Sequence, residues 1–235
     1  KHEKDVNLKI YAGELALLEK NPQQAAMHFR LAQKELSNSW QVRSGLRRAM
    51  VQGGRVVDAY HEAKKEGRRE FSALAYVCQQ SENVEQLEKL IAEYKKDAPS
   101  SHELVRWKLE VLKLKKDYEG ILNFIEQDPD KVLSRRYSWM RLRFLVDALL
   151  QKKKPAEALK AMQEAKAKKV TLQKSKELLI YASNGKVQES IKVMQALLWS
   201  RRDVESYYND PNLGPILKSK EFEESGMTLI TQPDS

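Results

Sequence analysis

The segment IYAGELALLEKNPQQAAMHFRLAQKEL, residues 10–36, predicts two antiparallel helices joined at Asn21 and Pro22. Asn is a preferred residue for the position that caps the start of a helix, because its side chain can accept a hydrogen bond from a free amide of the first turn. Pro22 then fits the first helical position, where its missing amide has no partner to lose. The segment therefore predicts a helical hairpin.

Small and apolar side chains predict the buried side of this hairpin. Ala25, Phe29 and Ala32 recur at the helical spacing i, i+4 and i+7 and predict one buried stripe on the second helix. Gly13 and Ala25 are small residues placed where two helix axes approach closely, and Phe29 fills the space beside them. The apolar residues expected on the buried side of the first helix are Leu15, Leu17 and Leu18.

This pattern resembles the tetratricopeptide repeat family, whose units carry two small positions, an aromatic residue four positions after the second, and an Ala three positions further on. The second small position returns every 28 to 38 residues, around the family's period of about 34. It is occupied by Ala25, Ala59, Leu87, Gly120, Ala158 and Ser190. The resemblance implies an all-α fold, a right-handed α-α superhelix (solenoid) of about six helix-turn-helix repeats.

The repeat pattern predicts an array over residues 1–199 and a capping segment with a tail over residues 200–235. The second repeat departs most from the pattern, at Gly45 and at the Gly53-Gly54 turn. After the first pair, the helices are expected at 40–52 and 56–66, 70–80 and 84–96, 102–115 and 118–127, 136–151 and 155–168, and 172–183 and 187–198.

Turn residues mark several of the predicted helix ends. Ser81 and Asp117 are expected as caps, Asp128-Pro129-Asp130 as a turn, and Asn184-Gly185 as a left-handed helix end. A short helix is expected at 203–208. The segment that follows resembles the one with which many bacterial arrays of this family end, and its apolar residues are expected to cover the last hairpin. These residues are Leu213, Ile216, Leu217 and Phe222.

Charge leaves several kinds of anionic partner open. The chain has 42 Lys and Arg against 33 Asp and Glu, a formal net charge of +9, which suits nucleic acid, an acidic peptide, a phosphorylated segment, or a membrane or cell-wall surface. However, many cations come in pairs near the ends of predicted helices, where they complement the helix dipole. The densest basic run has no interleaved aromatic residues on which bases could stack; it consists of Lys152 to Lys154 with Lys160, Lys166, Lys168 and Lys169. We therefore favour a solvated surface over a nucleic-acid site.

The sequence offers no constellation for catalysis or metal binding. The four histidines fall in different repeats or in the leading segment, and neither a nucleophile-elbow nor a phosphate-loop motif occurs. Cys78 lies on an apolar helix face and is expected to be a packing residue. Glu126, Asp128 and Asp130 cluster on a turn, where acidic residues usually serve as caps. We expect no enzymatic activity and no cofactor.

The resemblance implies that the first helix of each hairpin lines a concave surface that holds peptides. Tyr76 is the expected anchor, because an aromatic side chain on a helix buries much area at low entropic cost. The candidate ligand-binding residues are Arg48, Arg69, Tyr76, Gln79, His102 and Arg143; the same projection places Ile10, Glu14, Leu109 and Met140 on this surface. The acidic Glu14 argues against the mode in which one subfamily grips a chain-terminal carboxylate.

Two functional hypotheses follow. The first is a non-catalytic scaffold that binds an extended, possibly acidic peptide or partner protein on the concave surface. The alternative is a basic helical-repeat module that binds RNA or another polyanion, and it rests on net charge only. The chain has no apolar run near the ~20 residues that cross a bilayer and no visible signal peptide, and it begins at Lys1. An anchor or export signal upstream would fit this start, so the compartment and the oligomeric state stay open.

Overall fold

The computed structural model describes residues 2–127 and 137–226, and in these residues every regular element is a helix. The all-α prediction is confirmed for this part of the chain. The predicted turn at 128–130 and the predicted helix start at Arg136 lie outside the described residues. The chain divides into two compact units, Lys1–Asp117 and Tyr118–Ser235. The boundary falls between the two helices predicted as the fourth hairpin, and each unit is described separately.

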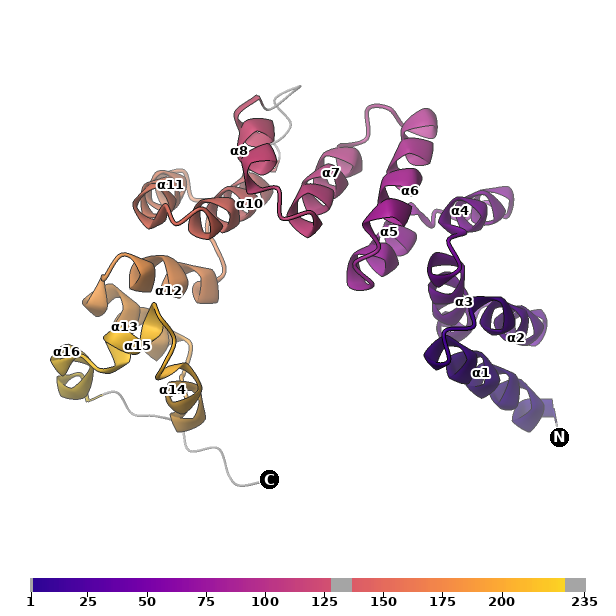
Figure 1. Ribbon diagram of the computed structural model, residues 1–235, viewed down its shortest axis with the longest axis horizontal. Coiled ribbons are helices and arrows are strands. Elements are labelled where there is room, and N and C mark those ends of the chain that lie inside the picture. Colours follow the sequence, from indigo (N-terminus) through magenta and orange to yellow (C-terminus); the bar gives the residue numbers. More distant parts are fainter. Residues whose placement is uncertain (1, 128–136, 227–235) are drawn as a thin grey trace. The chain divides into compact units, whose positions relative to one another are not determined.

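The first unit contains seven described helices, close to the predicted ranges. They are α1 (His2–Leu18), α2 (Pro22–Glu35), α3 (Trp40–Gln52), α4 (Val56–Lys65), α5 (Phe71–Gln80), α6 (Val84–Asp97) and α7 (His102–Leu114). Figure 1 shows α1 and α2 side by side, and α2 packs extensively on α3 as well. The odd-numbered helices contact each other in succession, α1 with α3, α3 with α5 and α5 with α7. They therefore form a continuous row.

Phe29 joins the first hairpin to the second. Its ring is completely buried. A Cβ atom on Gly13 of α1 would lie 2.8 Å from the ring, and one on Gly45 of α3 would lie 2.3 Å from it. Both glycines therefore allow a helix to approach the same ring closely. Gly45, the residue that departed from the repeat spacing, has a clear packing role.

The second unit contains the remaining described helices. They are α8 (Tyr118–Gln127), α10 (Ser138–Gln151), α11 (Pro155–Ala167), α12 (Lys174–Ser183), α13 (Val187–Ala196), α14 (Arg201–Tyr207), α15 (Leu213–Leu217) and α16 (Lys220–Glu224). Consecutive helices pack together from α10 to α13, and α8 packs on α10. Ala158, the expected small residue of α11, is fully buried among apolar neighbours of α10.

The predicted cover over the last hairpin is present. Leu213, Ile216 and Leu217 of α15 are buried in one cluster with Leu178 of α12 and Met194 of α13. Phe222 of α16 packs against this cluster and is partly buried. The short helices therefore remove from water the apolar surface that α12 and α13 leave on that side.

Three predicted turn residues lie where the local sequence placed them. The Asn21 side chain accepts a hydrogen bond from the backbone amide of Gln24, as predicted for the cap of α2. Gly185 adopts the left-handed conformation expected after α12, with φ of +63°. Ser81, the cap predicted between α5 and α6, caps the end of α5, where its hydroxyl donates to carbonyls of the last turn. The start of α6 is capped by Asn83, whose side chain accepts from the amide of Gln86.

The prediction for the buried side of α1 is wrong in part. Leu15 and Leu18 are exposed, whereas Val6, Ile10 and Ala16 are buried against the second helix of the hairpin. The helical pattern of α1 contains two apolar faces, and Gly13 with its neighbours forms the one that contacts α2. No described helix covers the opposite face.

Candidate functional site

A groove follows the row of odd-numbered helices in the first unit. It has a volume of about 480 Å³ and receives side chains from α1, from α3 and from the end of α5. Its lining is mixed: apolar groups lie beside amides, a hydroxyl and one ion pair. The lining residues are Glu14, Leu17, Leu18, Arg48, Val51, Gln52, Val77, Ser81 and Asn83. This is the surface on which the predicted ligand-binding residues should converge.

Two polar contacts fix the walls of the groove. Arg48 of α3 donates to the Glu14 carboxylate of α1 in an ion pair that leaves both side chains accessible to solvent. The Gln52 side-chain amide donates to the backbone carbonyl of Leu17 at 3.4 Å. The helices α1 and α3 are therefore held together along the groove by side chains that a ligand can also reach.

The candidate residues of the first unit do not all lie on the groove. Arg48 lines the groove directly. Tyr76 is 54% exposed on α5, one residue before the groove residue Val77, and Gln79 is partly buried on the same helix. Arg69 is exposed in the connection before α5 rather than on a helix. His102 is exposed at the first position of α7.

Three residues projected onto the binding surface lie in the core instead. Ile10, Leu109 and Met140 have at most 4% of their surface exposed. These side chains are fully apolar, and they are buried among the neighbouring helices. Arg143, the candidate residue of the second unit, lies on α10 with its guanidinium carbon 4.5 Å from the centre of the Phe144 ring. This cation–π contact orients Arg143 within its own helix.

Sequence reasoning missed several groove residues. Val51, Gln52 and Val77 were not among the candidates, and Leu17 and Leu18 were expected to be buried. Leu17 and Leu18 follow Glu14 at i+3 and i+4, and Val51 and Gln52 follow Arg48 at the same spacing. Residues at i+3 and i+4 lie on the same face of a helix, so this spacing could have identified these four residues as neighbours of Glu14 and Arg48 on the groove.

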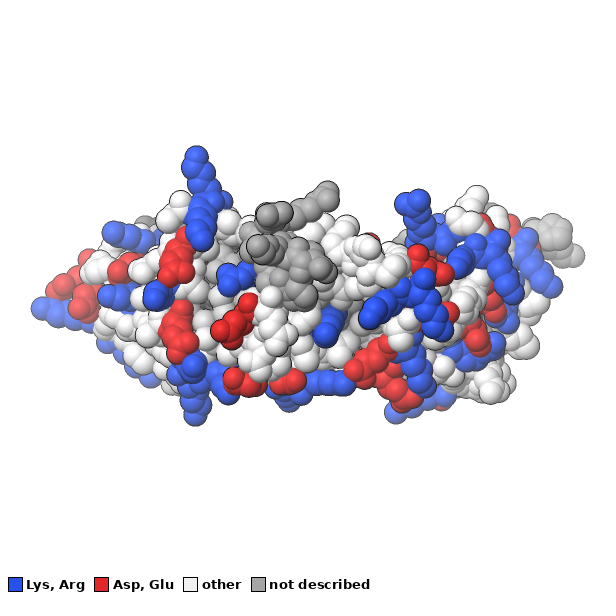
Figure 2. Space-filling view, turned by 90° about the horizontal axis from the view of Figure 1, so that it is seen from above, with Lys and Arg blue, Asp and Glu red and all other residues white. Residues whose placement is uncertain are grey.

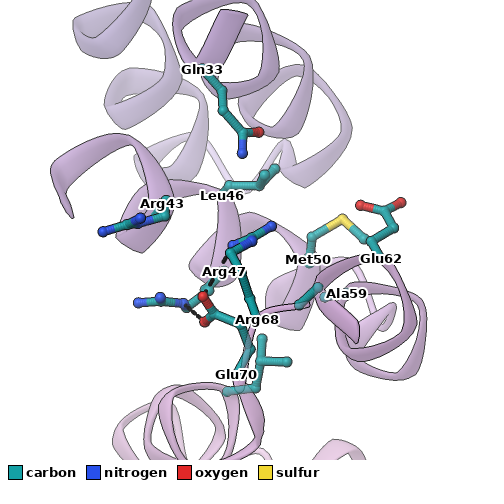
Figure 3. A pocket seen from close by; sticks show the side chains of 11 residues that line it. Gln33, Arg43, Leu46, Arg47, Met50, Ala59, Glu62, Arg68 and Glu70 are labelled. Carbon is teal, nitrogen blue, oxygen red and sulfur yellow. Dashed lines mark hydrogen bonds and ion pairs between the residues drawn. The ribbon is translucent and has the colours of Figure 1, made fainter. Parts of the chain in front are cut away.

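A second cluster of charges lies on the other side of α3 and ties it to the start of α5 (Figure 3). Arg47 donates to one oxygen of the buried Glu70 carboxylate at 2.5 Å, and Arg68 donates to the other at 3.0 Å. Burial by itself raises the pKa of Glu70, but the hydrogen bonds and charges of Arg47 and Arg68 outweigh it and lower the pKa. The carboxylate is therefore held ionised as a structural bridge.

Many cations of the predicted basic run also have carboxylate partners. Lys152 contacts Glu119 at 2.5 Å, and Lys154 contacts Glu157 at 3.1 Å. Lys166 contacts the buried carboxylate of Glu177. On the face drawn in Figure 2, Lys and Arg side chains lie among Asp and Glu side chains rather than in one patch. These pairs reduce the positive field available to a polyanion.

The structure also shows the surroundings of the Cys78 thiol and of the side chains that could bind a metal ion. Cys78 is fully buried as expected, and this burial raises the pKa of its thiol to about 12, so the reactive thiolate is suppressed. Within the described ranges, His, Cys, Asp and Glu side chains form no group of three that could hold a metal ion.

Among the helices of residues 2–127 and 137–226, none combines the length and the apolar character needed to cross a bilayer.

Comparison of the chain with protein-family models, with curated proteins and with solved structures found no match.

Proposed function

We propose that this chain is a tetratricopeptide-like solenoid that acts as a non-catalytic scaffold, binding an extended segment of a partner protein. The groove along α1, α3 and α5 carries this proposal. It is continuous over three successive hairpins of the first unit, as an extended segment requires. Rigid helices provide its walls, so a ligand that binds there has little conformational entropy to remove from the protein.

The packing of the helices supports a repeat architecture. Phe29 between two glycines repeats the combination of small and aromatic residues that brings successive hairpins together in such arrays. The successive contacts among α1, α3, α5 and α7 provide the row of first helices that a concave surface needs. A right-handed superhelix follows from the same connectivity in this family.

The lining of the groove indicates the kind of segment that fits. Leu17, Val51 and Val77 offer apolar contacts, while Gln52 and Asn83 offer amides to a peptide backbone. Tyr76, which is exposed on α5 one residue before the lining residue Val77, is the proposed aromatic anchor. Arg48 shares its charge with Glu14, so the groove itself is close to neutral.

Ligands selected from a random peptide library displayed on phage would test the scaffold. We expect Tyr76→Ala and Gln52→Ala each to weaken the selected peptides about tenfold in Kd, measured by fluorescence polarisation, because the first removes the proposed aromatic anchor and the second removes an amide that lines the groove. Trp139→Ala is the matched control, since Trp139 is 52% exposed but lies on α10 of the second unit. Selected peptides whose affinity is unchanged by both groove substitutions would rule out this surface.

The polyanion alternative gains no support from the ion pairs of the described residues. Titration with a single-stranded RNA at several salt concentrations separates the two functions. Release of several counterions predicts a steep fall in affinity with salt, whereas peptide binding to a near-neutral groove predicts little change. Tight, steeply salt-dependent RNA binding would favour the alternative.

A further inference from the structure

Four large apolar side chains stand exposed along the face of α1 opposite α2. Leu8, Tyr11, Leu15 and Leu18 expose 65%, 68%, 56% and 81% of their surface. They follow each other at i, i+3, i+7 and i+10, so they lie in one row on the helix. We call these four residues the α1 seam. A row of this size on a water-facing helix marks an interaction surface.

The spacing of the α1 seam is that of two coiled-coil heptads. Leu8 and Leu15 occupy a positions, and Tyr11 and Leu18 occupy d positions. A strict a/d row of period 3.5 is narrower than the stripe of a helix packed in a globular core and suits pairing with one other helix. The geometry of the seam thus specifies a helix as its occupant.

In the next two hairpins, the residues equivalent to the α1 seam are buried against another helix. Val42, Gly45 and Ala49 of α3 have the spacing of Leu8, Tyr11 and Leu15, and they are buried in one cluster with Phe29 of α2. On α5, the equivalent residues are buried together with Tyr60 of α4. These residues are Phe71, Leu74 and Cys78. In α3 and α5 this row is therefore buried with residues of an amphipathic helix that precedes it.

Charges beside the α1 seam select among possible helices. The flanking e and g positions hold Asp5 and Glu19 on one side and Glu14 on the other, with no cation among them. Asp5 lies 3.6 Å from Lys9, and Glu14 pairs with Arg48, while Glu19 has no ion pair among the described residues. Two copies of α1 would place these carboxylates against each other, Glu14 against Glu19 if parallel and Asp5 against Glu19 if antiparallel. Like charges at such positions disfavour a second copy.

We propose that the α1 seam binds an amphipathic helix of a partner protein, with apolar residues at its a and d positions and Lys or Arg at its flanking positions. The seam buries its apolar row against the partner, and Glu19 pairs with the basic flank. This site goes beyond the scaffold function, because its ligand is helical rather than extended and because Leu18 is the one seam residue that also lines the groove.

Two synthetic peptides of 21 residues test the proposal on the full chain. Both carry Leu at every a and d position; one carries Lys at every e and g position and the other carries Glu. Like charges on each peptide keep it from pairing with itself. We expect the Lys peptide to bind at least tenfold more tightly than the Glu peptide in isothermal titration calorimetry, and Glu19→Lys to reduce this preference.

Variants identify the surface that is used. Leu15→Glu should abolish binding of the Lys peptide, whereas Leu198→Glu, at a leucine 68% exposed in the second unit, should leave it unchanged. Circular dichroism confirms that both variants are folded. Tyr76→Ala should also leave binding unchanged, so failure of the α1 seam and failure of the scaffold groove can be told apart.

Three results would overturn the proposal. One is equal binding of the two peptides, and another is binding that survives Leu15→Glu. The third is a dimer of the chain in sedimentation that Leu15→Glu converts to a monomer, because a second copy would then occupy the seam.

Discussion

At the scale of the residue, packing around Phe29 explains why small residues return along the chain. The ring is buried between α1 and α3, and it contacts both at glycines. A glycine inside a helix costs about 1 kcal/mol relative to alanine in helix propensity. At Gly13 and Gly45 this cost is offset because any larger residue would meet the ring. The small residues are therefore a consequence of hairpin packing.

Replacing Gly45 by alanine tests this explanation. A Cβ atom at this position would lie 2.3 Å from the Phe29 ring, so we expect Gly45→Ala to lower the free energy of unfolding by about 1–3 kcal/mol despite the better helix propensity of alanine. Phe29→Leu in the same chain should recover part of the loss, because it removes the atoms that clash. Urea denaturation of the two single variants and the double variant measures this coupling. Strictly additive effects would mean that the ring and the glycine do not constrain each other.

At the scale of the element, the positions of the helices could be predicted from the sequence because their ends carry local signals. Asn21 with Pro22 and Asn184 with Gly185 set helix ends through hydrogen bonds and backbone conformations that involve only nearby residues. Asn83 was not identified as the cap of α6, because Ser and Asn can both cap a helix and only the geometry of the turn separates the roles of Ser81 and Asn83.

The neighbours of each helix face were harder to predict. Leu15 and Ile10 are similar residues on the same helix, but Ile10 faces α2 and Leu15 does not. The apolar pattern of α1 fits both faces, so the sequence could not tell the core from the α1 seam. The groove was predicted in part, through Arg48 and Glu14, whereas its apolar lining residues, such as Leu17, Val51 and Val77, resemble core residues.

A buried ion cluster links two elements, and it predicts a response to acid. The pKa of Glu70 is lower in the folded chain than in the unfolded chain, so its stabilising contribution is complete above the unfolded pKa and is lost as the pH falls through the folded pKa. We expect Glu70→Gln to lower the free energy of unfolding by about 2 kcal/mol at pH 7, because charged hydrogen bonds to Arg47 and Arg68 are removed. At pH 3 the difference between variant and parent should be smaller.

The matched control for Glu70 is Glu85, which is exposed and pairs with Lys89 on the surface of α6. Glu85→Gln should change stability much less, since exposed pairs contribute little. Urea denaturation at pH 7 and at pH 3 provides the comparison. If Glu70→Gln and its parent differed equally at both values of pH, the carboxylate would not be the titrating group.

At the scale of the whole molecule, the described helices contact mainly the helices that are near in sequence. The stability of such a chain comes from the interfaces between successive helices rather than from one central core. A change in one interface should then loosen that part of the chain and leave distant parts intact. The division into two compact units points in the same direction.

A substitution in the cover of the last hairpin tests this local behaviour. Ile216 is 2% exposed and packs in the cluster of α12, α13 and α15, so Ile216→Ala should cost about 2–5 kcal/mol in that cluster. In hydrogen exchange measured by mass spectrometry, we expect faster exchange in α12, α13 and α15, and unchanged exchange in α2, α3 and α6 of the first unit. Ile121→Ala, at an equally buried residue of α8, is the control and should shift the loss toward α8 and α10. Equal acceleration in both units would mean that the chain unfolds as one cooperative block, and the stabilising contacts would then have to extend well beyond neighbouring hairpins.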